Sequence, residues 1–367
     1  GKMLSQTSVT TAWEAITKML DIFSAKLGDL RLWSIGLASV VALLQPKAFA
    51  WMSPSLVQWL LFVLFFLTGV TAEPADFQAC LRRPRPIFIN IGACFVMVPL
   101  LAMVLGKTMG LSPGLVAGMV LIGSVNGGAS SSLFTLLAGG DMALSVVMTT
   151  ISTVVAVVAT PFAVQTLLGT TVPVNAQFVL LPIFLGVSAN AVMPCICAWL
   201  KPAIPMLVGT LAVPISGAVV VGGAGPMFSG GLPLHVAVIL LHSCSGALGY
   251  QLGKVSGGSE QECRTLAFTV AVKHVALASV LASAYFQDPS VQVPSAASCI
   301  WCPILCSALA NYWKSNPIAL DAGKKGDCQG YFDDNSWVKQ YYTGMYLSGS
   351  CKVNIEGAIC GKGYCMG

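Results

Sequence analysis

Charged residues are scarce in this chain, at 9% of its 367 residues, whereas soluble globular domains carry about 25%. Apolar residues make up 56% of the sequence, and the mean hydropathy is +0.79. Apolar runs recur at a length of about 20 residues, which matches the hydrocarbon core of a bilayer. The scarcity of charge therefore excludes a chain built from soluble domains and predicts an all-α membrane protein.

Sequence patterns of two other protein classes are also missing. Basic residues do not alternate with aromatic residues and the net charge is only +5, so nucleic-acid binding is not expected. We find no nucleophile–histidine–acid set, Walker loop or Gly-x-Gly-x-x-Gly turn after a strand, and predict no catalytic residue. Cys299 and Cys302 form a Cys-x-x-Cys within an apolar run, where small packing residues are expected, and no metal site is predicted.

Ten apolar segments are expected to cross the membrane. They are residues 31–50, 55–73, 87–105, 111–139, 142–168, 176–200, 203–222, 233–255, 260–287 and 294–313. Basic residues gather at both ends and in the even-numbered loops, whereas the odd loops hold Lys47 and Lys107. Because cytoplasmic loops carry the excess of Lys and Arg, both termini are predicted on the cytoplasmic side or its stromal equivalent.

Two flanking segments differ from the ten-helix domain at residues 31–316. Residues 1–30 have the pattern of an amphipathic helix that lies on the membrane surface. Residues 317–367 form a polar tail rich in cysteine and aromatic residues. Its cysteines lack the paired Cys-x-x-Cys knuckles of zinc sites, so we interpret the tail as a small cap on the membrane domain.

Two of the apolar segments are interrupted by polar residues. The fourth contains the run Asn126–Ser132, which includes Gly127 and Gly128, and the ninth contains Lys273 and His274. Broken helices at corresponding places in the two halves of a chain indicate a transporter's binding site between inverted repeats. The alternative is a patch of small residues that lets helices approach closely.

Short motifs follow one another in order along residues 30–315. They are Ala75-Asp76-Phe77, Arg82-Arg83-Pro84-Arg85, Gly127-Gly128, Leu137–Ser145, Ser152-Thr153, Thr160-Pro161, His242, Gly249-Tyr250, Arg264–Ala267 and Ala308–Trp313. With these motifs the chain resembles the bile acid:sodium symporter family, in its plastid and bacterial branch. The resemblance implies two inverted five-helix repeats, divided into panel and core domains, with broken and crossing fourth and ninth helices. It also implies transport of organic anions in a plastid membrane, with monocarboxylate-like substrates.

The same resemblance implies where sodium ligands would lie. A family glutamate falls at Thr269, and the Gln-Asn pair four positions later falls at Lys273 and His274. A third-helix glutamine falls near Cys94. The substrate and ion site is therefore expected at Asn126, Gly127, Gly128, Ser131, Ser132, Ser145, Thr149, Thr269, Lys273 and His274.

Lys273 argues against conventional sodium coupling. A sodium site usually includes an anionic oxygen, which Thr269 does not supply, and an ammonium repels a second cation. Three interpretations remain open: the Lys273 ammonium replaces sodium, titrates together with His274 to couple transport to protons, or binds an anion directly. A further alternative is that the Lys273 side chain extends into a polar pocket of a scaffold that does not transport.

Two functions of different class follow. The first is a secondary transporter of small organic anions that works by alternating access and is not sodium-coupled. The second is a transport-inactive protein of this fold, recruited as a structural subunit of a larger membrane complex such as a photosynthetic one. Both have membrane lipids as partners. The second would use the N-terminal helix and the C-terminal tail to dock, and would bind lipids or pigments; no other cofactor is predicted.

Overall fold

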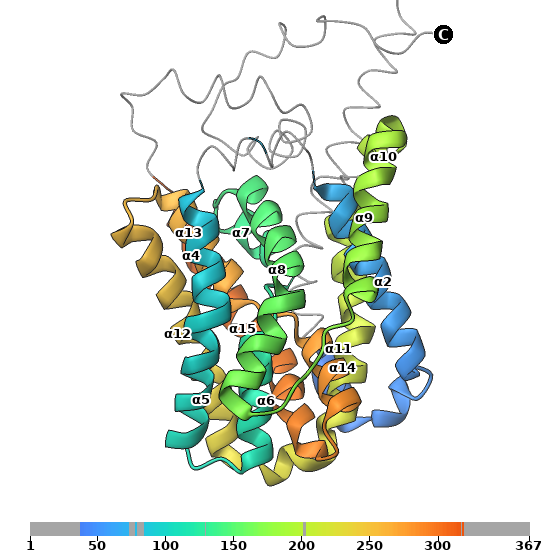
Figure 1. The fold of residues 1–367 in the computed structure, drawn as a ribbon, viewed down its shortest axis with the longest axis vertical. Helices are drawn as coiled ribbons and strands as arrows, with labels where there is room; N and C mark the ends of the chain where they lie inside the picture. The colour runs from blue at the N-terminus through green and yellow to red at the C-terminus, as the bar shows by residue number, and fades with distance from the viewer. Residues whose placement is uncertain are drawn as a thin grey trace, which may run out of the picture. The chain divides into compact units, whose positions relative to one another are not determined.

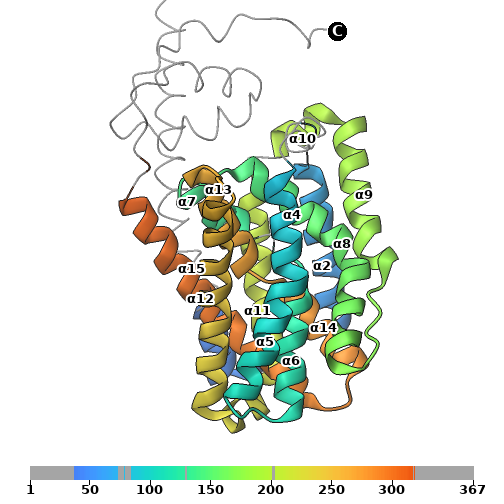
Figure 2. The ribbon, with the colours of Figure 1, turned by 60° about the vertical axis from the view of Figure 1, so that its left-hand side comes forward.

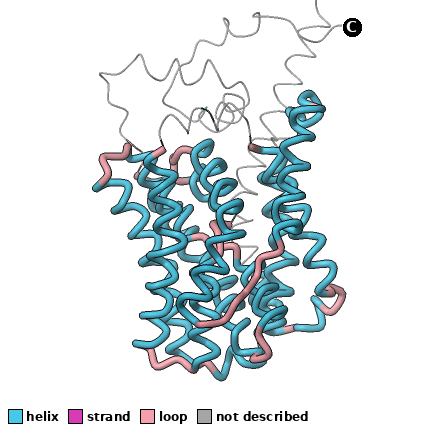
Figure 3. Tube along the Cα trace, in the orientation of Figure 1, coloured by secondary structure: helices cyan, strands magenta, loops and turns pink. Residues whose placement is uncertain are grey.

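The computed structural model describes residues 37–72, 84–128, 130–200 and 203–316, together with the single residues 78 and 318. The regular structure of these residues is helical, and their strand-like pairing is an isolated bridge between Gly127 and Lys273 (Figure 3). The predictions for residues 1–30 and for all but residue 318 of 317–367 lie outside the described residues.

Six stretches are long and apolar enough to cross a membrane. They are α2 (Pro54–Thr71), the continuous run of α4 (Arg85–Gly92), η2 (Ala93–Met97) and α5 (Val98–Thr108), α8 (Met142–Leu168), the part Leu207–Ala224 of α11 (Ile204–Ser229), α12 (Gly231–Val255), and α15 (Val293–Ser315) together with the short η4 (Pro289–Gln292) before it. The prediction of an all-helical, multi-pass membrane chain is thereby confirmed (Figure 1).

Shorter elements connect or flank these stretches. They are a helix at residues 37–44, η1 (Pro46–Phe49), α9 (Ala176–Val192) and α10 (Pro194–Leu200). The predicted segment 176–200 is divided at Met193, because the following Pro194 disfavours helical backbone at the residue before it. The seventh predicted segment, 203–222, is continued in α11 as far as Ser229.

The two predicted breaks are confirmed. α6 (Pro113–Ser124) is followed by α7 (Ser131–Leu137), and α13 (Glu260–Ala271) by α14 (Val275–Tyr285). A helix of 12 residues is about 18 Å long, well short of a hydrocarbon core of about 30 Å. α6 contacts α14, and α7 contacts α13 in the upper part of both views (Figures 1 and 2). The broken helices therefore meet at their breaks.

Close backbone approach joins α2 to α9. A Cβ atom on Gly69 of α2 would lie 2.2 Å from the carbonyl oxygen of Ile183 in α9. Without a side chain the backbones can touch, as small residues allow at helix interfaces in membranes. α11 packs against α2 and, more extensively, against α15, so it lies between α2 and α15.

One packing group contains the broken helices. α12 packs along α13, and α15 contacts α11, α12 and α14. At one end of this group, buried Arg264 of α13 donates to the carbonyl oxygens of Ala138 at 2.8 Å and Asn316 at 3.0 Å. Arg264 thereby connects the C-terminal ends of α7 and α15, whose last carbonyls have no partner within their own helices.

The third predicted span contains a feature that the sequence did not indicate. Its middle, η2, is a π-helical stretch rather than regular α-helix. Such stretches are rare and occur often at functional sites, because the wider turn changes which backbone groups are free. η2 includes Cys94, which lies against the break between α13 and α14.

Candidate functional site

The two breaks meet backbone to backbone. The amide of Gly128 donates to the carbonyl oxygen of Val272 at 2.9 Å, and the amide of His274 donates to that of Asn126 at 3.0 Å. These bonds flank the antiparallel bridge between Gly127 and Lys273. Irregular backbone is tolerated at membrane depth only where its polar groups find partners, and here each break supplies partners for the other.

Gly127 and Gly128 carry no side chains at this crossing, where there is no room for a Cβ atom. A Cβ atom on Gly127 would lie 2.9 Å from the carbonyl oxygen of Thr269, and one on Gly128 would lie 3.0 Å from that of Lys273. Both obstacles are backbone atoms, which cannot rotate away. The Gly-Gly pair is therefore required by the crossing itself.

Lys273 is buried at this crossing, with 3% of its surface exposed. Its Nζ atom lies 3.5 Å from the carbonyl oxygen of Cys94 and 3.5 Å from that of Val125. Within the described part of the chain, no carboxylate pairs with it. The ammonium therefore lies between two backbone carbonyls rather than beside an acid.

The carbonyl of Val125 belongs to the C-terminal end of half-helix α6, where Val125 is the cap residue. The preceding carbonyl, on Ser124, accepts a hydrogen bond from the Thr160 hydroxyl at 2.7 Å. A helix C-terminus carries partial negative charge and leaves its last carbonyls without helical partners. Thr160 and Lys273 thus provide donors for the carbonyls of Ser124 and Val125, which have no helical partners.

Asn126 carries an acceptor without a partner. Its Nδ2 donates to the Thr153 hydroxyl at 2.6 Å, and that hydroxyl donates in turn to the carbonyl of Thr149 at 2.7 Å. Because the Thr153 proton is already used, the amide must face it with its NH₂ group. This leaves Oδ1 of Asn126 buried, with no hydrogen-bond partner among the described residues. Such an atom is uncommon in folded proteins and marks a place where a ligand or water can bind.

The predicted hydroxyl residues form a second group between α7 and α8. Ser131 Oγ lies 3.3 Å from Thr149 Oγ1, and Ser132 Oγ lies 3.2 Å from Ser145 Oγ. Thr149 connects this group to Asn126 through Thr153. The structure therefore brings together residues of the fourth, fifth and ninth predicted segments.

Thr269 and His274 use their side chains locally. The Thr269 hydroxyl donates to the carbonyl of Thr265 in its own helix at 3.1 Å. His274 is the N-cap of α14, where its Nδ1 accepts from the amide of Leu277 at 3.4 Å, and its ring lies 5.0 Å from that of Phe65. An N-cap nitrogen must carry a lone pair, so this contact requires the unprotonated Nδ1.

Sequence reasoning missed the residues that complete the site. Val125 and the π-helical backbone at Cys94 contribute carbonyls, which every residue has, so no side-chain pattern could indicate them. Thr153 accepts from Asn126 and donates to Thr149, a pair of contacts that depends on the tertiary structure. His242, one of the motif residues, forms hydrogen bonds at both ring nitrogens, with the carbonyl of Ala271 at 2.8 Å and the hydroxyl of Ser298 at 3.0 Å.

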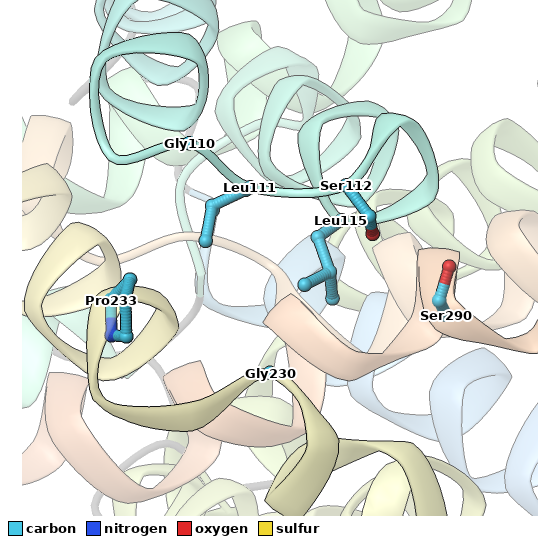
Figure 4. Close-up of a pocket in the computed structure, with 7 residues that line it drawn as sticks. All are labelled: Gly110, Leu111, Ser112, Leu115, Gly230, Pro233 and Ser290. Carbon is cyan, nitrogen blue, oxygen red and sulfur yellow. The ribbon is translucent and has the colours of Figure 1, made fainter.

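A pocket of about 230 Å³ lies elsewhere (Figure 4). Its lining residues are Gly110, Leu111, Ser112, Leu115, Gly230, Pro233 and Ser290. They lie at the beginnings of α6 and α12 and in η4, whereas the crossing lies at the other end of α6, about 18 Å along that helix. This pocket includes none of the predicted site residues.

Comparison with known proteins gives the family. The family model described as "Sodium Bile acid symporter family" matches residues 58–230. The chain is 33% identical over 304 residues to a rice protein (Oryza sativa subsp. japonica) named probable sodium/metabolite cotransporter BASS2, chloroplastic, covering 80% of this chain and 72% of that one. It is 31% identical over 288 residues to YocS of Bacillus subtilis (strain 168), named an uncharacterized sodium-dependent transporter, covering 76% and 89%. It is 30% identical over 297 residues to probable sodium/metabolite cotransporter BASS1, chloroplastic, of Arabidopsis thaliana, covering 78% and 74%. The chain therefore belongs to the sodium bile acid symporter family of membrane transporters.

Proposed function

We propose that this chain is a secondary transporter of small organic anions, monocarboxylates in particular, that works by alternating access without sodium coupling. The observation that carries this proposal is the crossing of two broken helices, with Lys273 buried at their junction. Broken helices of this kind hold the substrate sites of transporters near the middle of the membrane.

The proposed architecture has ten spans in two inverted repeats. The helix at residues 37–44, α2, α4 to α5, the pair α6 and α7, and α8 would form the first five. The pair α9 and α10, α11, α12, the pair α13 and α14, and α15 would form the second. Each broken pair is then fourth in its repeat. Antiparallel pairing of the two breaks is what an axis in the membrane plane would produce, and α2, α9 and α11 would form the panel against a core that contains the breaks.

The charge of the site favours an anionic substrate. The buried Lys273 ammonium and the N-terminus of the 11-residue helix α14 both present positive potential at the crossing. Hydroxyl groups of Ser131, Ser132 and Thr149 could donate to a carboxylate. The names of the relatives, which include metabolite cotransport and chloroplasts, support a metabolite substrate and a plastid membrane. Both termini would then face the stroma.

The second candidate is a transport-inactive subunit of a membrane complex. The low exposure of Lys273 is compatible with it, since a closed scaffold would also bury the crossing. Its proposed docking segments, residues 1–30 and 317–367, are outside the described part of the chain, apart from residue 318.

Uptake by the purified protein in liposomes separates the two candidates. Radiolabelled pyruvate, lactate and acetate would be tested with a sodium gradient, with a pH gradient and with neither. We expect saturable uptake of at least one of these anions, above that of protein-free vesicles, in sodium-free buffer. Absence of uptake under every condition would favour the structural subunit, and uptake that requires sodium would overturn the proposed lack of coupling.

A further inference from the structure

We propose that the Lys273 ammonium is the resident cation of the site and fills the place that a coupling sodium ion would take. This inference rests on the transport function proposed above and names how its binding site is charged. The position of Nζ between two backbone carbonyl oxygens carries the inference.

Two oxygens from separate elements converge on Nζ. The carbonyl of Val125 comes from the end of α6, and that of Cys94 comes from the π-helical stretch η2. Backbone carbonyls from unwound or terminal helix segments are the groups that hold coupling ions in transporters with broken helices. The separations of 3.5 Å are longer than the usual N–H···O range of about 2.7–3.2 Å, so Nζ lies near both carbonyls without a short bond to either.

The charge of Lys273 is balanced by dipoles. The acidic residues that the structure describes lie at helix ends, at Asp141, Glu260, Glu262 and Asp288, and none of them pairs with Lys273. The negative end of the α6 dipole and two carbonyls are therefore the compensating groups. They compensate the buried ammonium in place of an acidic side chain.

The residues present do not fit a sodium ion. Nζ of Lys273 already lies against both carbonyls, and a second cation there would meet direct repulsion in a region of low dielectric constant. Thr269 carries a neutral hydroxyl, which donates to its own helix, so this residue supplies no negative charge to balance a second cation. Repulsion therefore disfavours sodium binding at this place while Lys273 is charged.

A tethered cation has a functional consequence. A coupling ion arrives and leaves in each cycle, whereas Lys273 remains, so the site stays ready for an anion without a second solute. Transport would then follow the substrate's own gradient or exchange one anion for another, because no ion gradient contributes free energy.

The test removes the tethered cation and supplies a free one. Lys273→Ala leaves the two carbonyls without Nζ, and methylammonium or sodium is then added as a replacement. We expect pyruvate uptake by Lys273→Ala to fall about tenfold, the effect of losing one interaction of about 1.4 kcal/mol, and to recover with methylammonium. The unfolding temperature of the variant in detergent should rise with the same cation. Wild-type protein should respond to neither cation in either measurement.

Lys254→Ala is the matched control. Lys254 is an exposed lysine of α12 whose Nζ lies 5.9 Å from the ring centre of Tyr250, so its removal changes the net charge equally without touching the crossing. This variant should behave like the wild type with and without cations. A cation response shared by both variants would overturn the proposal.

Three other results would also overturn it. They are a wild type that sodium stabilises or activates, a Lys273→Ala variant with unchanged uptake, and wild-type uptake that a pH gradient drives and Lys273→Gln abolishes. If Lys273→Ala does not fold, Lys273→Gln and the wild-type cation response still decide. If the wild type transports nothing, the proposed function fails, while the unfolding measurements test the resident cation independently.

Discussion

Gly127 and Lys273 pair across an antiparallel backbone bridge, although they belong to broken helices in different halves of the chain. On either side of the bridge, Gly128 and His274 donate their amides to the opposite break. The bridge therefore makes the two breaks one structural unit, and a change in either segment is expected to disturb both.

Gly127→Ala should destabilise this unit. The added Cβ would lie 2.9 Å from the Thr269 carbonyl oxygen, so the two backbones must separate. Overpacking of this kind costs about 1–3 kcal/mol, and we expect a lower unfolding temperature and reduced uptake. The control is Gly92→Ala in helix α4, where an added Cβ meets no atom within 4 Å. Equal effects of the two substitutions would show that the backbones at the crossing are not tightly packed.

Thr153→Val should cost more than Thr150→Val, although both remove a buried threonine hydroxyl from α8. The Thr153 hydroxyl accepts from Asn126 at 2.6 Å, and its loss leaves the Asn126 Nδ2 with only the carbonyl of neighbouring Gly127, at 3.0 Å, as acceptor. The Thr150 hydroxyl donates only within its helix, to Val146. We expect a difference of about 1–2 kcal/mol in the free energy of unfolding, measured by denaturation in detergent. A difference near zero would argue against the Asn126 contact.

His274→Ala and His274→Asn distinguish a capping role from a proton-carrying role. Alanine removes the N-cap of α14 and should cost about 0.5–2 kcal/mol, whereas asparagine is among the best capping residues and should restore most of it. Uptake by His274→Asn should stay near the wild-type level across pH 5–8, the range in which an unperturbed histidine titrates. Loss of uptake in His274→Asn, despite normal stability, would indicate that the imidazole carries a proton.

The triple variant Thr269→Glu, Lys273→Gln, His274→Asn carries the residues that the family resemblance implies at these positions. It removes the ammonium and adds a carboxylate, so the crossing should bind sodium. Binding to the folded state alone raises stability by about 2.7 kcal/mol at a sodium concentration one hundred times Kd, which a shift in unfolding temperature would report. Lys273→Gln alone lacks the carboxylate and should respond less. A triple variant that ignores sodium would mean that another part of the site prevents binding.

Several features were predictable because they depend on local patterns. Apolar runs of membrane-spanning length gave the long helices, and the polar interruptions near Asn126 and Lys273 gave the two breaks. The division at Met193 and the π-helical stretch η2 were not predicted. Hydropathy indicates which segments lie within the membrane. It does not distinguish an α-helical turn from a π-helical one, or a straight helix from a divided one.

The sequence by itself determined that this protein is a helical membrane protein of its family, that two helices are broken, and that a lysine lies in one of the breaks. Only the tertiary structure decided what surrounds that lysine. The groups around Nζ are backbone carbonyls of Cys94 and Val125, which belong to different elements. Every residue has a carbonyl, so its role depends on where the fold places it, and no arrangement of side chains along the chain could reveal it.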